Sequence, residues 1–173
     1  AAQVDTAGMS RPVAVFNALS WEREEWLPLE GQWQRVTVPP LGYAVVDAAI
    51  PDEVQNLTGT PESLENDLVC VTFAADGSIV SFFDKRANRE IIPTGRSANR
   101  LAVYVDLGDA WDFPMDYADQ TPRTMELISA DAHVDGPTAV LVQVYRLGHS
   151  VLTQKIVLTA GSPRLDFICH LRW

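Results

Sequence analysis

The residues from Asp106 to Asp119 bring carboxylates and aromatic rings together in one short segment, DLGDAWDFPMDYAD, which contains five aspartates. Carboxylates accept hydrogen bonds from sugar hydroxyls, and a flat ring packs against the C–H face of a pyranose. Two interpretations follow. Either the segment contributes to a carbohydrate site, or its rings plug the open end of a β-structure while the carboxylates remain solvated.

If this segment touches a substrate, the expected contacts are Trp111, Asp112 and Tyr117. A retaining glycosidase needs two carboxyl groups about 5 to 5.5 Å apart, and spacing in the sequence does not place Asp112 and Asp116 at that distance. Other chemistry-bearing patterns are absent from the sequence, including H-E-x-x-H, paired thiolates at zinc spacing, G-x-S-x-G and the glycine-rich phosphate loops. We therefore expect no closed zinc site within this chain, and the acidic and aromatic segment is the one candidate for chemistry that remains.

Composition and charge restrict the classes of molecule that this chain can bind. Of 173 residues, 47% are hydrophobic and 21% charged, as in ordinary globular proteins. The formal net charge is -10, which disfavours binding to nucleic acid or to an anionic membrane surface. No apolar run reaches the length of about 18 residues that a membrane helix needs. Cys70 and Cys169 show no framework spacing, and no signal peptide precedes them, so we expect free thiols and a cytoplasmic location.

The elements that must position the acidic segment are strands. Apolar or alternating stretches recur about every ten residues between Gly, Pro, Asn and Asp, which is typical of an antiparallel sandwich or barrel. Alternation in 69–73, the turn Asp76-Gly77 and renewed alternation in 79–83 predict a β-hairpin. The other expected strands are 13–16, 21–27, 32–38, 43–46, 101–105, 125–130, 140–147, 151–159 and 165–173.

The predicted strands fall into two groups. Residues 11–48 form a small β unit, 49–63 read as a linker rich in turn residues, and 64–173 begin a larger β-sandwich. Trp21, Trp26 and Trp33 lie in the small unit, and we expect at least one of them to face a neighbouring domain. The sequence starts at Ala1 and stops within a predicted strand at Trp173, so we expect a piece of a longer protein.

Several stretches in register resemble glycoside hydrolase family 38, the α-mannosidases. They are VFNALSWEREEW (15–26), VPPLGYAVV (38–46), LENDLVCVTFAADGSIVSFFDKRANREII (64–92) and NRLAVYVD with the AWD that follows (99–112). Ala18 stands where the family often has proline, and the loop from Asp106 to Tyr117 is shorter than in many bacterial members. The resemblance covers nearly the whole chain, from Val4 to Trp173.

This resemblance implies a truncated, antiparallel β-sandwich of the galactose-mutarotase-like, or supersandwich, type, with residues 1–10 as the tail of a preceding helical segment. It implies a parent that hydrolyses terminal α-mannosidic bonds of glycans, with zinc and the catalytic aspartate in an N-terminal catalytic domain outside this chain. The chain itself would then be an inactive scaffold and domain interface. Because unpaired sheet edges can pair with another copy, a homo-oligomer is also possible. The alternative is a free-standing carbohydrate-binding β-sandwich without catalysis; a purely structural interaction domain is a third.

Overall fold

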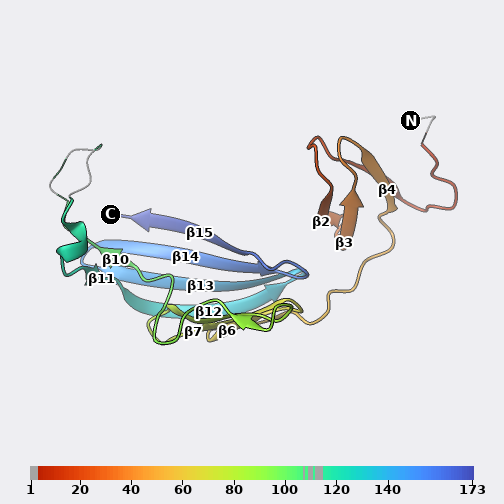
Figure 1. Ribbon diagram of the computed structural model, residues 1–173. Helices are drawn as coiled ribbons and strands as arrows, with labels where there is room; N and C mark the ends of the chain where they lie inside the picture. The colour runs from red at the N-terminus through yellow and green to blue at the C-terminus, as the bar shows by residue number, and fades with distance from the viewer. Residues whose placement is uncertain (1–3, 107, 109–110, 112–114) are drawn as a thin grey trace. The chain divides into compact units, whose positions relative to one another are not determined.

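The computed structural model describes residues 4–106, 108, 111 and 115–173 (Figure 1). Within these residues the chain forms strands β1 to β15 and one short 3₁₀ helix, η1 (Tyr117–Asp119), with no α-helix. The described strand pairs are antiparallel, which confirms the predicted all-β, antiparallel class. In this described part of the chain, no helix has the length and apolar character needed to cross a membrane.

Two compact units divide the chain, Ala1–Gln55 and Asn56–Trp173. In the first unit, β1 (Pro12–Phe16) pairs with β4 (Tyr43–Asp47) and β2 (Arg23–Leu29) pairs with β3 (Gln32–Val38). Alternate residues of β3 are buried, as expected of a strand with one face on a core. Residues 4–10, the described part of the range predicted as a helical tail, contain a turn and no helix.

The second unit contains a five-stranded sheet in the order β5-β6-β7-β8-β9. Its strands are β5 (Thr58–Thr60), β6 (Ser63–Glu65), β7 (Val69–Phe73), β8 (Ile79–Asp84) and β9 (Arg89–Glu90). The predicted hairpin is present as β7 and β8, because Val71 lies opposite Phe82 across the pair. Gly77 has φ +82° in the turn, and a Cβ there would lie 2.0 Å from the hydroxyl oxygen of Tyr145, so glycine is favoured and any larger residue requires Tyr145 to shift.

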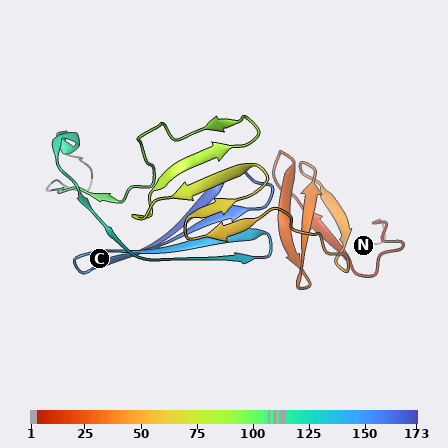
Figure 2. The same ribbon diagram turned by 90° about the horizontal axis from the view of Figure 1, so that it is seen from below.

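A four-stranded meander, β12-β13-β14-β15, forms the other layer of the second unit (Figure 2). Its strands are β12 (Glu126–Asp135), β13 (Thr138–Leu147), β14 (Ser150–Thr159) and β15 (Leu165–Arg172). The buried core draws on both sheets, which makes the unit a sandwich. Its members are Leu64, Val69, Val71, Phe73 and Ile79 from the first sheet and Ala139, Leu141, Ile156 and Leu158 from the second.

Asn66 ties the two sheets together with a completely buried side chain. Its amide nitrogen donates to the carbonyl oxygens of Thr159 (2.8 Å) and Ser162 (2.7 Å), beyond the end of β14. Its amide oxygen accepts from the backbone nitrogens of Leu68 (2.9 Å) and Val69 (3.0 Å), which shapes the turn into β7. One side chain thus makes hydrogen bonds to four backbone groups at the junction of the two sheets.

Two segments are more regular than the sequence predicts. Strand β5 lies inside 49–63, the range predicted as a linker; a Cβ at Gly59 would lie 3.3 Å from the Cβ of Ala139, so glycine allows β5 to pack closely on β13. Strand β12 continues past its predicted end at Ala130. The sequence prediction missed this part because its inward-facing residues include small alanines, which give only a weak alternation of apolar and polar side chains. Its pairing with the regular strand β13 extends it to Asp135.

Candidate functional site

A short two-stranded ribbon carries the acidic and aromatic segment, residues 106–119, which we call the aspartate loop. The ribbon consists of β10 (Ala102–Val103) and β11 (Arg123–Thr124), a shorter β10 than the predicted 101–105. The side chain of Gln120 closes the loop above the ribbon. Its amide oxygen accepts from the backbone nitrogen of Val105 (3.1 Å), and its amide nitrogen donates to the carbonyl oxygen of Val105 (3.2 Å).

A second hydrophobic cluster fixes this ribbon to the four-stranded sheet. Met125, Tyr145 and Leu152 are buried in it, and Val103 of the ribbon and Leu101, which directly precedes the ribbon, pack against them. The hydroxyl group of Tyr145 donates to the amide oxygen of Gln143 at 2.8 Å. Burial, with a smaller contribution from Asp76, raises the pKa of Tyr145 to about 12, so this tyrosine stays neutral and structural at physiological pH.

Tyr117 is the predicted site residue with the best-defined surroundings. It begins η1, and its ring meets that of Tyr104 edge to face, with centroids 5.7 Å apart and an interplanar angle of 82°. The side chain remains 44% exposed. Tyr104 directly follows the ribbon strand β10, and the sequence prediction missed it because it lies outside the aspartate-rich segment.

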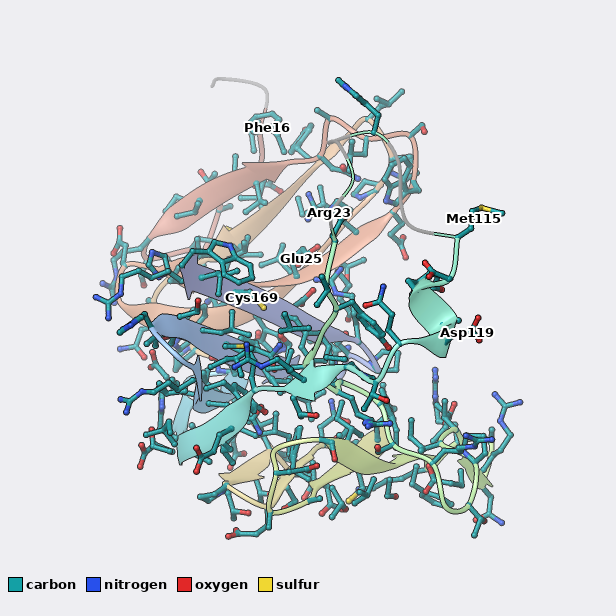
Figure 3. The ribbon with its side chains drawn as sticks, turned by 90° about the vertical axis from the view of Figure 1, so that its left-hand side faces the viewer. Phe16, Arg23, Glu25, Met115, Asp119 and Cys169 are labelled. Carbon is teal, nitrogen blue, oxygen red and sulfur yellow. The ribbon has the colours of Figure 1, made fainter. Side chains whose placement is uncertain are left out.

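Trp111, the second predicted contact, is 92% exposed, and Asp112, the third, lies outside the described residues. Met115 is fully exposed, and it projects with Asp119 away from the sheets (Figure 3). Figure 1 shows η1 at the end of the sandwich where β15 finishes. The described part of the loop is an open surface that presents aromatic rings and carboxylates to solvent, so it is suited to stacking against a sugar ring rather than to enclosing a substrate.

Histidines and carboxylates do not gather into a ligand set in the described part of the chain, where no three His, Cys, Asp or Glu side chains lie together as a metal site would need. His133 lies on β12, His149 lies in the turn between β13 and β14, and His170 lies on β15. The zinc that the family resemblance implies belongs to a domain of the parent outside this chain, and it stays a prediction.

Carboxylates with lowered pKa values hold turns in place. The hydroxyl group of Ser81 donates to Glu90 at 2.6 Å, and the backbone nitrogens of Ile92, Phe82 and Ile91 donate as well; these bonds lower the pKa of Glu90 to about 2. The pKa values of Asp47, Asp76 and Asp84 are also lowered, mainly by hydrogen bonds to their carboxylates. Groups of this kind remain ionised at neutral pH and do not serve as proton donors.

An exposed apolar patch covers one end of the first unit. We call it the unit 1 patch; its members are Phe16 (75% exposed), Leu19 (37%), Trp21 (60%), Leu41 (73%) and Tyr43 (47%). The rings of Phe16 and Tyr43 are in contact, with centroids 5.8 Å apart. The backbone nitrogen of Leu41 donates to the carbonyl oxygen of Leu19 at 2.9 Å, which joins the two loops that follow β1 and precede β4.

Asn17 fixes the shape of these loops beneath the unit 1 patch. The side chain is buried, and its amide nitrogen donates to the carbonyl oxygens of Trp21 (2.7 Å), Val38 (3.2 Å) and Pro39 (3.1 Å). A patch of large apolar side chains held by a satisfied buried network is typical of an interaction surface.

Comparison with known proteins decides the family. A family model described as the C-terminal domain of glycosyl hydrolases family 38 matches residues 64–173. The chain belongs to glycosyl hydrolase family 38. Within this family, it is 28% identical to Alpha-mannosidase 2C1 of Mus musculus over 92% of its length, and 28% identical to the Homo sapiens protein of the same name over 92%. It is 23% identical to Alpha-mannosidase G of Dictyostelium discoideum over 80% of its length.

The family 38 match contains the aspartate loop and the four-stranded sheet, and the alignments with the two Alpha-mannosidase 2C1 proteins extend beyond it into the first unit. The chain spans only 15% to 17% of the length of these curated relatives. The family resemblance read from the sequence is therefore confirmed.

Proposed function

We propose that this chain is part of an α-mannosidase that hydrolyses terminal α-mannosidic bonds of glycans. The observation that carries this proposal is the match of residues 64–173 to the family 38 C-terminal domain, together with relatives whose names are those of α-mannosidases. The proposed role of the chain is to support and contact a catalytic domain elsewhere in the parent protein. The alternative, a free-standing carbohydrate-binding sandwich, is not favoured, because the relatives are several times longer than this chain.

We assign the zinc ion and the catalytic residues to that catalytic domain. The described residues of this chain bring together no metal-ligand cluster. The proposed contribution of this chain to chemistry is therefore indirect: it positions loops and domain surfaces around a site built elsewhere.

The unit 1 patch supports the role of domain interface. Three aromatic side chains and two leucines lie exposed at the ends of β1 and β4 and on the adjoining loops, which Asn17 holds in one conformation. Burial of apolar surface contributes about 25 cal/mol per Å², so a rigid patch of this kind favours a permanent neighbour. We propose the catalytic domain of the same polypeptide as that neighbour.

The aspartate loop is the part of the chain proposed to reach the sugar. Trp111 and Tyr117 present aromatic rings to solvent, and Asp112 follows Trp111 directly in the sequence. An exposed ring can stack on a pyranose, and a neighbouring carboxylate can accept its hydroxyl hydrogen bonds. We propose that the loop forms one edge of the substrate site in the parent.

We also propose a cytoplasmic location for the parent. Cys70 and Cys169 are free thiols, which are typical of a reducing compartment. Fractionation of cells that produce the parent, followed by an immunoblot against this segment, tests the proposal: recovery in the cytosolic fraction supports it, and recovery in secretory vesicles contradicts it.

The deciding experiment measures hydrolysis of an aryl α-mannoside by the purified full-length parent, with the corresponding α-glucoside and β-mannoside as controls. Release of the aryl group from the α-mannoside alone supports the proposed activity. Removal of zinc by a chelator and its restoration then test the assignment of the metal. Glycan binding by the parent without hydrolysis of any α-mannoside would contradict the proposal and favour a binding protein.

A further inference from the structure

Tyr104 supports the aspartate loop from the side of the ribbon. It directly follows β10, and its ring meets that of Tyr117 edge to face, with centroids 5.7 Å apart and an interplanar angle of 82°. An edge-to-face contact covers at most one face of either ring. Tyr117 is 44% exposed, whereas Trp111 and Met115 of the same loop are 92% and 100% exposed. Tyr117 therefore has more than half of its surface covered by protein and still presents ring surface to a ligand.

Gln120 joins the two chain segments that carry these rings, and Figure 1 shows η1 next to the ribbon. Its side-chain oxygen accepts from the backbone nitrogen of Val105 (3.1 Å), and its side-chain nitrogen donates to the carbonyl oxygen of Val105 (3.2 Å). The backbone nitrogen of Gln120 donates to the carbonyl oxygen of Tyr117 at 3.2 Å. One glutamine is thus bonded to the residue next to Tyr104 and to Tyr117 itself.

The ring pair is anchored in the second hydrophobic cluster. Val103, the residue before Tyr104, packs against this cluster, in which Tyr145 is only 2% exposed. The contacts therefore run from the buried core through the ribbon to Tyr104, and from Tyr104 to Tyr117. A side chain that is held in this way loses little conformational freedom when a ligand binds, so the ligand is bound more tightly.

We propose that Tyr104 is a positioning residue for the sugar contact of Tyr117, and that Gln120 keeps the two rings together. The inference rests on the proposed function, because it requires the aspartate loop to lie at the substrate site of the parent. Tyr104 and Gln120 act through Tyr117 and not by touching the sugar. Their contribution is to hold the ring of Tyr117 in the orientation that stacks on a pyranose before the sugar arrives.

Three substitutions in the full-length parent test this role through the KM for an aryl α-mannoside. Tyr104→Leu removes the ring, Tyr104→Phe keeps the ring without its hydroxyl group, and Gln120→Leu removes both side-chain hydrogen bonds. We expect KM to rise about fivefold in Tyr104→Leu and Gln120→Leu, with kcat changed less than about twofold, and to stay unchanged in Tyr104→Phe. Partial unfolding lowers the apparent kcat and leaves the KM of the folded molecules unaltered, so KM separates positioning from stability.

Each of these variants can also contradict the proposal. An unchanged KM in Tyr104→Leu would overturn the role of Tyr104, and an unchanged KM in Gln120→Leu would overturn the role of Gln120. Equal rises in Tyr104→Leu and Tyr104→Phe would assign the effect to the hydroxyl group and overturn the ring contact as its cause.

A double substitution tests whether Tyr104 acts through Tyr117. Added to Tyr117→Ala, Tyr104→Leu should cause no further rise in KM, because the ring that it positions is already absent. A second rise of about fivefold would show that the two residues act independently, and would overturn the proposal. The control is Thr124→Ala, on the exposed β11 strand of the same ribbon, which should leave KM unchanged. A similar rise in this control would show that any change in the ribbon suffices, which also overturns the proposal.

Binding of an S-linked α-mannoside, which resists hydrolysis, separates this inference from the proposed function. The Kd is measured by calorimetry for the parent and for Tyr104→Leu. A parent that hydrolyses no α-mannoside, but binds the S-linked sugar more weakly after Tyr104→Leu, contradicts the α-mannosidase proposal alone. An active parent whose Kd and KM are both unchanged by Tyr104→Leu contradicts this inference alone. A parent that neither hydrolyses nor binds α-mannosides overturns both.

Discussion

Two buried asparagines organise the two units in the same way. Asn17 holds the loops of the first unit, and Asn66 joins the two sheets of the second. Each side chain uses both its donor and its acceptor groups on backbone atoms of loops and strand ends. Such a residue determines the path of the chain where strands cannot supply hydrogen bonds.

Replacement of Asn66 tests its importance for the second unit. Asn66→Ala removes four hydrogen bonds to backbone groups, so we expect a loss of about 3 kcal/mol in the free energy of unfolding. Urea unfolding followed by circular dichroism measures the change. The control is Asp67→Ala at the exposed neighbouring position, which should change stability by less than about 0.5 kcal/mol. Equal effects of the two substitutions would contradict the role assigned to Asn66.

Glu90 predicts a pH-dependent contribution to stability. Its pKa falls from an ordinary value of 4.5 to about 2 in the folded chain, because Ser81 and three backbone nitrogens donate to the carboxylate. The folded state therefore gains stability at pH above 4.5 and loses it as the pH falls through about 2. Glu90→Gln should lower the melting temperature at pH 7, with a difference from the unsubstituted chain that narrows below pH 4.5. Glu22→Gln, at an exposed position of the first unit, is the control. A difference that stays constant from pH 7 to pH 2.5 would count against this account.

Alanine substitutions at Gly77 and Gly95 separate the stability cost of steric overlap from the cost of a left-handed backbone. Gly77→Ala places a Cβ 2.0 Å from the Tyr145 hydroxyl oxygen at φ +82°, whereas Gly95→Ala meets nothing within 4 Å at φ +74°. We expect Gly95→Ala to cost about 1 kcal/mol from left-handed strain alone, and Gly77→Ala to cost about 2 to 4 kcal/mol because overlap adds to it. Thermal unfolding of the two variants gives the comparison. Similar losses would show that Tyr145 moves aside at no cost.

At the scale of elements, the aspartate loop is the feature whose function can be measured. In the full-length parent, Trp111→Ala, Asp112→Asn and Tyr117→Ala should each lower kcat/KM for an α-mannoside about tenfold, the equivalent of 1.4 kcal/mol of lost transition-state stabilisation. Met115→Ala is the matched control, because Met115 is fully exposed in the same loop and offers no ring or carboxylate. Thermal melting of each variant separates loss of binding from loss of stability. Unchanged kinetics in all three variants would leave the loop without a role at the substrate site.

The sequence predicts strands well where side chains alternate strongly. Strand β3 and strand β7 occupy the predicted residues 32–38 and 69–73. Strand β5 is missed because its central Gly59 has no side chain, and its place depends on close packing against Ala139, which only the folded sheets reveal. The candidate site was likewise predicted only where it depends on residue types and not on contacts in the folded chain. Composition identifies Trp111 and Tyr117, but the ring contact between Tyr117 and Tyr104 joins residues from the two sides of the loop and is visible only in the folded chain.

At the scale of the whole molecule, the second unit is a sandwich in which β13 and β14 are covered by the facing sheet and β15 carries exposed apolar side chains. The core between the sheets is continuous from β7 to β14, and it ends at β15 where the facing layer ends. The first unit carries its own exposed patch of apolar side chains. Each unit thus has a stable interior and one apolar surface that remains to be covered, which is the property expected of a part that packs against further domains.

The unit 1 patch gives the corresponding test in the parent. If the catalytic domain packs on this patch, Phe16→Ser combined with Trp21→Ser removes apolar contact from the interface and should split the calorimetric unfolding of the parent into two transitions or lower its melting temperature by several degrees. The control is Ile50→Ser, since Ile50 is 65% exposed in the same unit but does not belong to the patch. Both proteins are also treated with a protease under limiting conditions, because a weakened interface should make cleavage between the catalytic domain and this chain faster. If the double variant unfolds and resists protease as the control does, the patch faces solvent in the parent and the domain interface lies elsewhere.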